Sequence, residues 1–260
     1  MEFIKRLFFC VFLFGSVNCF AKKRRVLNFL TVNYCPMICK DGVDKGIIVD
    51  ILHSTFSSKN FDVRVHFVPI KRAFLKSNKK NYDGFLGGNK NQLKGNLFPE
   101  FVTVPNIVRF YKHRTSKWKY ENLQSLDSTS ILSVKDYDHS NFEFDLYLKS
   151  KNSKNVVYIN DYDHLDQMVS LILRKRYDIF VAGHLALDYF LKDHPKRDEI
   201  VPEPKEVGIF KNYISFYPTR KRSKTLLNHF EKEFKKITKN GELALIYKKY
   251  GVRGVIREIK

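Results

Sequence analysis

The chain alternates between strand-like and helix-like segments, and this alternation constrains its fold more than any other feature. Apolar strand runs occupy residues 26–33, 61–68 and 82–86, and helical patterns separate them at residues 46–56 and 70–77. Three strands linked by two helices within about sixty residues are typical of βαβ units, whose parallel strands are covered by helices. We therefore predict an α/β fold.

The same alternation occurs a second time further along the chain. The expected segments are a strand at 130–134, a helix at 142–150, a strand at 155–159, a helix at 164–175, a strand at 178–182, a helix at 185–192 and a polar loop at 193–205. The carboxyl-terminal part differs, with a strand at 212–216 and helices at 224–239 and 241–250.

The charge of the chain is large and unevenly distributed. A length of 260 residues with 43% apolar side chains can bury a core, which excludes disorder, but 47 basic and 27 acidic residues leave a net charge of +20. Residues 1–112 carry +12, residues 113–208 carry −2 and residues 209–260 carry +10. Such a charge would ordinarily suggest an anionic partner, a nucleic acid or a membrane surface, and here it is confined to the two ends.

The amino terminus has the order of a secretory signal peptide. A short basic start precedes the apolar run 7–14, and small residues follow at Cys19 and Ala21. The run is shorter than the roughly 20 apolar residues that span a bilayer. Four basic residues at 22–25 oppose export, because basic flanks tend to stay in the cytoplasm. We favour a signal peptide over residues 1–21, cleavage after Ala21 and a periplasmic location.

Two cysteines remain after such cleavage, Cys35 and Cys39. In an oxidising compartment this pair favours a local disulfide, and the alternative is two unpaired thiols packed as small apolar groups. No histidine pair or Cys-His cluster has metal-ligand spacing, so neither a metal site nor a cofactor is expected.

Five stretches of the chain together resemble a known family, the type II periplasmic solute-binding proteins of family 3, which includes polar amino acid binders. They are YCPMICKDGVDKGIIVDIL at 34–52, PIKRAF at 69–74, YDGFLGG at 82–88, RKRYDIFVAGHLALDYFL at 174–191 and HFEKEFKKITKNGELALIYKKYGV at 229–252. The resemblance implies two α/β lobes joined by two crossing strands, near residues 107–111 and 209–215, with the ligand bound between the lobes.

The resemblance also implies domain boundaries. Residues 22–108 and 213–260 would form one discontinuous lobe, and residues 109–212 would form the other. Both basic ends of the chain would then belong to the first lobe.

The site is expected in the loops that follow the strands, because open α/β sheets bind ligands at the carboxyl ends of their strands. Tyr34 could wall the cleft, the Arg72 guanidinium could bind a carboxylate or phosphate, and the turn of Gly87, Gly88 and Asn89 could offer backbone N–H groups. The simpler alternatives are that Tyr34 packs beside Pro36, that Arg72 lies on a solvated helix face and that the glycine turn has no binding role.

The remaining candidates lie near the crossing and in the second lobe. They are Phe110 and Tyr111, then Tyr137 and Ser140 in the loop KDYDHS, and His184. That loop could hold an anion at the start of the following helix, although its two aspartates oppose this. Asp178, at the start of a strand, is assigned to structure.

Two departures from the family pattern argue against a standard α-amino acid as ligand. The stretch GNKNQLKGNLFPEF carries Lys90 and Lys94 but lacks the arginine that clamps a ligand carboxylate in the family. Gly183 and His184 stand where the family tends to have an aspartate for the ligand amine.

The leading hypothesis is a monomeric, non-catalytic protein that closes on a small polar solute, anionic or neutral, and delivers it to an inner-membrane permease or a receptor. The first alternative is an enzyme on this scaffold, similar to cyclohexadienyl dehydratase, with Glu100, His139 and His184 as acid or base candidates. The second is charge-driven binding to an anionic envelope surface, which steep salt dependence of vesicle binding would support. We also expect the basic lobe to orient the protein toward an anionic membrane or transporter face, which charge reversal at Lys221, Arg222 and Lys235 should weaken. A signal peptide argues against nucleic acid.

Overall fold

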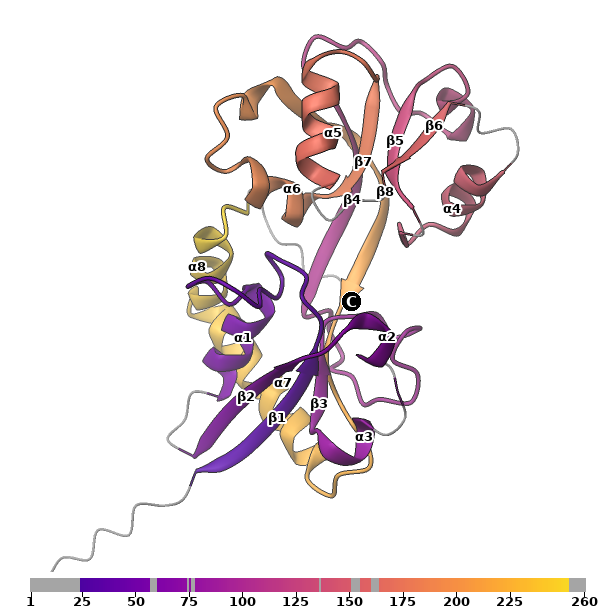
Figure 1. The fold of residues 1–260 in the computed structure, drawn as a ribbon. Coiled ribbons are helices and arrows are strands. Elements are labelled where there is room, and N and C mark those ends of the chain that lie inside the picture. The colour runs from indigo at the N-terminus through magenta and orange to yellow at the C-terminus, as the bar shows by residue number, and fades with distance from the viewer. Residues whose placement is uncertain are drawn as a thin grey trace, which may run out of the picture.

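The computed structural model describes residues 24–252 except 57–59, 74, 76–77, 136, 151–154 and 160–163. Its strands form one sheet of four strands and one of five. Figure 1 shows these sheets in two separate lobes, with two long strands running between them. The predicted two-lobed α/β architecture is confirmed, whereas the predicted signal peptide lies outside the described residues. None of the described helices is long and apolar enough to cross a membrane.

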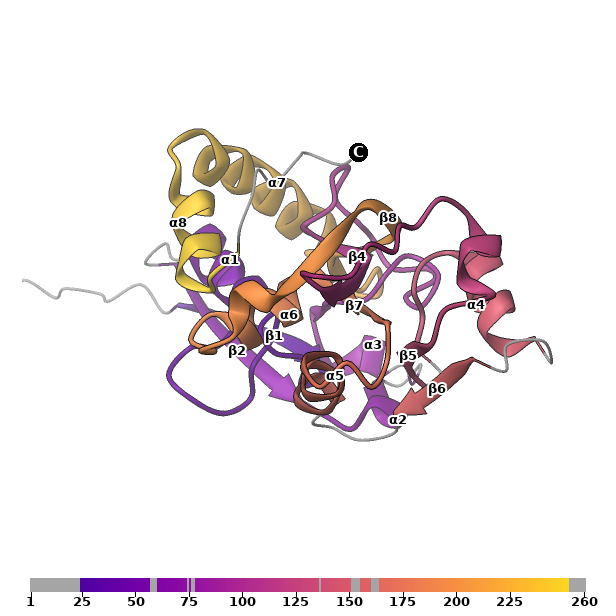
Figure 2. The ribbon, with the colours of Figure 1, turned by 90° about the horizontal axis from the view of Figure 1, so that it is seen from above.

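The first lobe is built on the sheet β2-β1-β3-β9, in which only β9 runs antiparallel to its neighbour. Its strands are β1 (Arg25–Thr31), β2 (Phe61–Phe67), β3 (Gly84–Leu86) and β9 (Ile214–Phe216). Its helices are α1 (Ile47–Phe56), α2 (Ile70–Ala73), α3 (Asn78–Asn81), α7 (Ser223–Lys239) and α8 (Glu242–Lys249). Seen from above, α1, α7 and α8 gather on one side of the molecule (Figure 2).

Helix α7 shows why these segments pack together. Leu226, Phe230, Phe234 and Ile237 recur at helical spacing and are buried, while the lysines between them are exposed. The Phe230 ring lies 6.4 Å from Phe56 of α1, so that the apolar stripe of α7 closes one face of the sheet. Burying each such side chain contributes roughly 1.5–3 kcal/mol.

A buried ion pair ties the start of α7 to the sheet. The Asp83 carboxylate, whose side chain is 1% exposed, accepts from Arg222 Nε at 2.9 Å and from the Asn28 backbone N–H at 2.9 Å. Arg222 also donates to the Val26 carbonyl at 2.8 Å. Arg222 therefore holds β1 and the entry to β3 together, and it is unsuitable as a surface-charge probe.

The second lobe is built on the sheet β6-β5-β7-β4-β8, in which β5 is parallel to β6 and β7, and β4 is antiparallel to β7 and β8. Its strands are β4 (Val104–His113), β5 (Ile131–Val134), β6 (Val156–Ile159), β7 (Ile179–Gly183) and β8 (Ile200–Asn212). Its helices are α4 (Phe142–Lys149), α5 (His164–Leu173), α6 (His184–Leu191) and the short 3₁₀ segments Leu123–Leu126 and Arg197–Glu199. A hydrophobic core lies on each face of this sheet.

Strands β4 and β8 connect the lobes as an antiparallel pair. Val104, which pairs with Asn212, belongs to the core of the first lobe, whereas Val108 belongs to a core of the second. The crossing is longer than the expected 107–111 and 209–215, and β9 is a separate strand. The exact lobe boundaries stay predictions.

Two predictions for individual segments are wrong. The loop expected at 193–205 ends early, because β8 begins at Ile200 and its polar Glu203 is buried in an ion pair with Lys112 of β4. The helix expected at 70–77 stops at Ala73, which packs into the small core around Leu30. Leu75, two residues after Ala73, lies outside the helix and is 52% exposed, and residues 74, 76 and 77 lie outside the described residues.

Candidate functional site

The loop after β1 presents Tyr34 from a tightly closed turn. The backbones of Tyr34 and Ile38 exchange two hydrogen bonds of 2.8 Å, and a disulfide joins Cys35 to Cys39 across the same turn. Met37 and Ile38 are buried in the core of the first lobe. The buried side chains of Met37 and Ile38 and the disulfide hold this turn in place, and they thereby fix the position of Tyr34.

Tyr34 and Tyr137 connect the two lobes. Tyr137 follows β5 of the second lobe, and its hydroxyl lies 2.7 Å from that of Tyr34, 103 residues earlier in the chain. We call these two residues the tyrosine pair. Burial raises the pKa of both hydroxyls above 10, and for Tyr137 the neighbouring Tyr34 raises it further. Both side chains are therefore neutral at physiological pH, and each can donate or accept one hydrogen bond.

A second, weaker contact lies beside the tyrosine pair. Asn89 Nδ2 donates to Asp138 Oδ2 at 3.4 Å, which connects the turn after β3 with the loop after β5. Asn89 Oδ1 meanwhile accepts from the Gln92 N–H at 2.9 Å. The loops that the sequence predicts as ligand-binding in the two lobes are therefore brought face to face.

Asn106 lies beneath the tyrosine pair, on β4 at the crossing. It is fully buried, its Oδ1 accepts from the Leu185 N–H at 3.3 Å, and its amide lowers the pKa of Tyr34 slightly against the larger effect of burial. Among the described residues no acceptor meets Asn106 Nδ2 with standard hydrogen-bond geometry, although the amide lies close enough to the Tyr34 hydroxyl to lower its pKa. A buried donor without a partner is costly, which makes this atom a candidate ligand contact.

Gly183 and His184 pack directly against this asparagine. A Cβ atom at residue 183 would lie 2.3 Å from Asn106 Nδ2, so only glycine fits. His184 Nδ1 accepts from the Ile107 N–H at 2.9 Å, and burial lowers the pKa of His184 to about 4. His184 is consequently neutral with its proton on Nε2, a hydrogen-bond donor rather than a charge.

The loop of Tyr137 and Ser140 is held by buried polar contacts. His139 is 1% exposed, its Nδ1 lies 2.6 Å from Asp145 Oδ1, and burial lowers its pKa, so the neutral ring donates to the carboxylate. Asp138 accepts from the Ser140 N–H at 2.8 Å, and Asn141 caps α4. These side chains already occupy the N–H groups that an anion would use, as the aspartates in the sequence suggested.

The remaining predicted residues of the first lobe lie at its edge toward the cleft. Arg72 is exposed on α2, which Figure 1 places at the end of the first lobe nearest the second. Gly87 and Gly88 have φ angles of 78° and 84°, and the Gly87 N–H donates to the Tyr213 carbonyl at 3.0 Å. Gly87 therefore shapes the turn, and its own N–H is already paired.

The assignment of Phe110 and Tyr111 as ligand contacts is corrected by their burial. Phe110 is 0% exposed and packs edge to face on Phe144, 5.3 Å between centroids. Tyr111 is 4% exposed and stacks on Phe180 at 5.4 Å. Phe110 and Tyr111 are neighbours on β4, so their side chains point to opposite faces of the sheet. Because a hydrophobic core covers each face, both rings are buried.

Asp178 has the structural role expected for it. Its carboxylate accepts from the Ser130 backbone N–H at 2.8 Å and from the Ser130 hydroxyl at 2.6 Å, which aligns the starts of β5 and β7. The described residues include no group of three His, Cys, Asp or Glu side chains that could hold a metal ion.

Asp188 lies one helical turn after His184 on α6. Burial raises the pKa of Asp188 to about 6, and the nearby Arg109 and Arg197 only partly offset this effect. Because the folded protein binds this proton more tightly than the unfolded chain does, ionisation of Asp188 destabilises the fold as the pH rises from about 4 through 6.

Asp188→Asn should therefore stabilise the protein by about 2 kcal/mol at pH 8, a gain that shrinks toward zero near pH 4. Urea unfolding at a series of pH values measures it. Asp193→Asn is the matched control, since the Asp193 side chain is 85% exposed and its replacement should have no such pH dependence. A gain from Asp188→Asn that is the same at pH 4 and pH 8 would contradict the assignment.

Comparison with known proteins shows similarity of structure rather than of sequence. No protein-family model and no curated protein matches the chain. The solved structure of YckB from Bacillus subtilis matches with a TM-score of 0.70 and 14% identity, covering 89% of this chain and 94% of that one. YtmK from Bacillus subtilis, a probable amino-acid ABC transporter extracellular-binding protein, matches with a TM-score of 0.68 and 12% identity over 88% and 98% of the two chains.

A third similar structure adds a conformational reference. Substrate-binding domain 2 of GlnP from Lactococcus lactis, solved in an open conformation, matches with a TM-score of 0.66 and 15% identity over 90% of this chain and 98% of that one. At these identities the comparisons show the fold. The chain has the two-lobed fold of periplasmic-binding-protein-like domains, and similar structures include substrate-binding proteins of amino acid ABC transporters.

Proposed function

We propose that this protein is an exported solute-binding protein, which captures a small polar solute between its lobes and passes it to an ABC-type transporter or a receptor. The observation that carries the proposal is the tyrosine pair, because it joins the loops after β1 and β5 where open α/β sheets bind ligands. Ligand binding would favour the closed arrangement, since only there do both lobes touch the solute.

The chemistry around the tyrosine pair supports a solute rich in hydrogen-bond acceptors. The groups gathered there are two neutral hydroxyls, which share one hydrogen bond, and Asn106 Nδ2, which has no hydrogen-bond partner of standard geometry among the described residues. Because one hydroxyl donates its proton to the other, one hydroxyl proton and the Asn106 amide remain to donate to a carboxylate or carbonyl oxygen. The absence of the family's arginine and aspartate from the sequence still argues against a standard α-amino acid.

A non-catalytic role is part of the proposal. Of the acid and base candidates, His139 is buried and held by Asp145, and Nδ1 of His184 is occupied by the Ile107 N–H. Glu100 lies at the surface of the first lobe, where its backbone N–H donates to Glu231. None of these three residues is therefore paired with another of the three as acid and base.

The basic charge of the first lobe supports a further part of the proposal, orientation toward an anionic membrane or transporter face. Lys221 and Lys235 are exposed and can serve in charge-reversal experiments, whereas Arg222 cannot, because it pairs with buried Asp83.

The solute can be identified directly. Mass spectrometry of the denatured, freshly purified protein should reveal a carried-over small molecule, and that compound should raise the melting temperature of stripped protein. If neither carryover nor a broad screen of amino acids, sugars and organic acids yields a stabilising ligand, solute binding is the wrong function.

Removing one hydroxyl of the tyrosine pair should open the lobes. Tyr34→Phe leaves the Tyr137 hydroxyl buried without its partner, so we expect the open fraction relative to the closed one to rise roughly fivefold to tenfold. The double variant Tyr34→Phe, Tyr137→Phe should be less perturbed than either single variant, because no orphaned hydroxyl remains. Single-molecule energy transfer between labels at exposed Lys232 and Lys119 measures the distribution. Identical distributions in all variants would show that the pair does not control closure.

A further inference from the structure

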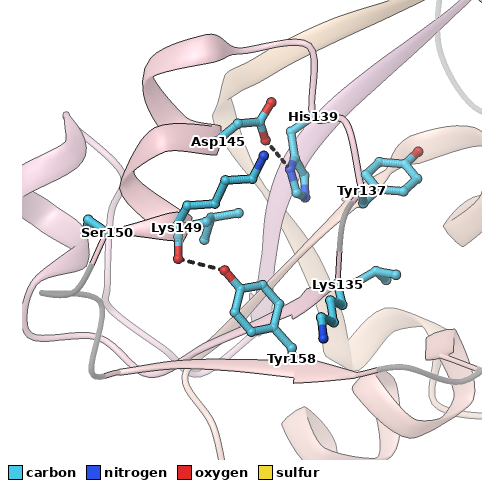
Figure 3. A pocket seen from close by; sticks show the side chains of 9 residues that line it. Lys135, Tyr137, His139, Asp145, Lys149, Ser150 and Tyr158 are labelled. Carbon is cyan, nitrogen blue, oxygen red and sulfur yellow. Dashed lines mark hydrogen bonds and ion pairs between the residues drawn. The ribbon is translucent and has the colours of Figure 1, made fainter.

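The second lobe contains a cavity whose described lining comes wholly from that lobe. It has a volume of about 350 Å³ and is lined from the end of β5, from α4 and from β6 (Figure 3). Its lining includes Tyr137, whose hydroxyl also contacts Tyr34 of the first lobe. This volume falls in the range of small-molecule sites, roughly 300–1,000 Å³. We call it the α4 pocket.

The described residues that line the α4 pocket carry a net positive charge. Lys135, directly after β5, and Lys149, in the last turn of α4, both line it and are exposed. In Figure 3 the Lys149 side chain reaches toward Asp145 and His139. Asp145 is the acidic residue in the lining, and its carboxylate accepts from His139 at 2.6 Å. Because burial keeps His139 neutral, the two ammonium groups outweigh one carboxylate that is already hydrogen-bonded.

The remaining walls of the α4 pocket are apolar. Val134 and Leu148 line it together with the rings of Tyr137 and Tyr158. The Tyr158 hydroxyl donates to the Leu148 carbonyl at 2.6 Å, and the Tyr137 hydroxyl bonds to Tyr34. Both hydroxyls are therefore engaged, their rings are held in place, and what they add to the wall is ring surface rather than a polar group.

We propose that the α4 pocket binds a small organic anion, a carboxylate on a compact apolar body. The carboxylate would lie toward Lys135 and Lys149, and the apolar body would lie against Leu148 and the Tyr158 ring. Inorganic phosphate would interact with the two lysines but not with the apolar wall. A neutral isostere would contact the apolar wall but would lack the attraction to the lysines.

Benzoate and its neutral isostere benzamide test this proposal with the full chain. Titration of protein labelled at leucine and valine methyl groups should shift the Val134 and Leu148 signals with benzoate, with half-saturation below about 1 mM. Benzamide and inorganic phosphate should each bind at least roughly tenfold more weakly. Leu52, in the core of the first lobe, is the internal reference and should not shift.

Lys135→Gln combined with Lys149→Gln should weaken benzoate binding roughly tenfold or more, whereas Lys119→Gln, at an exposed lysine elsewhere in the second lobe, should leave it unchanged. Both lysines are exposed, so the variants should keep the wild-type methyl spectrum. Equal affinity for benzoate and benzamide, a benzoate affinity that survives the double substitution, or no shift at Val134 and Leu148 up to about 20 mM would each overturn the proposal.

Discussion

Replacing Arg222 by alanine should lower the free energy of unfolding by about 3 kcal/mol or more, because it leaves the Asp83 carboxylate buried without its cation. Asp83 would retain the Asn28 N–H as a donor, and Val26 would lose the guanidinium that its carbonyl accepts from. Urea denaturation followed by circular dichroism measures the loss.

Lys221→Ala is the matched control for this experiment. Lys221 is the exposed neighbour of Arg222, and its truncation should change stability by less than about 0.5 kcal/mol. Asp83→Asn in the Arg222→Ala background should recover part of the loss, since an amide is cheaper to bury than an unpaired carboxylate. Equal effects of Arg222→Ala and Lys221→Ala would show that the ion pair contributes nothing.

Gly183→Ala should have the second largest effect, a loss of roughly 2–3 kcal/mol from overpacking at the crossing. The backbone of Gly183 has φ −75°, which any residue adopts, so glycine is required here for space rather than for conformation. The added methyl would lie 2.3 to 2.8 Å from three atoms of the Asn106 side chain. Asn106 is itself buried beneath the tyrosine pair, which restricts where it can move.

A double-mutant cycle isolates this contact. Asn106→Ser shortens the opposing side chain, so Gly183→Ala should cost at least about 1 kcal/mol less in that background than in the wild type. Urea unfolding of the wild type, the two single variants and the double variant gives the coupling free energy between residues 106 and 183. The single variant Asn106→Ser measures the effect of removing the amide on stability. Additive effects would indicate that the crowding is relieved elsewhere.

The elements that sequence patterns identified best are those with one apolar face. The period of α7 follows from burial on a single side, which a pattern of apolar residues reports directly. The start of β8 was missed because Glu203 is buried there by pairing with Lys112 in a strand far away in sequence. Such a partner is invisible to a local pattern.

The candidate site was only partly predictable for a related reason. Tyr34 and Tyr137 were identifiable as aromatic residues in loops after strands, but their 2.7 Å contact depends on how the two lobes meet. Phe110 and Tyr111 carry the same sequence signal, yet their strand lies inside a sheet covered on both faces. Aromatic character alone does not separate a cleft wall from a core.

The pairing of Val104 with Asn212 has a consequence for how the chain reaches its native state. The described strands between these two residues are β4 to β8, which form the sheet of the second lobe, whereas Phe216 and Phe230 of the first core come afterwards. During synthesis the second lobe can finish its cores while the first still lacks β9, α7 and α8. The amino-terminal strands must therefore wait for the last segment of the chain, with their apolar faces uncovered until it arrives.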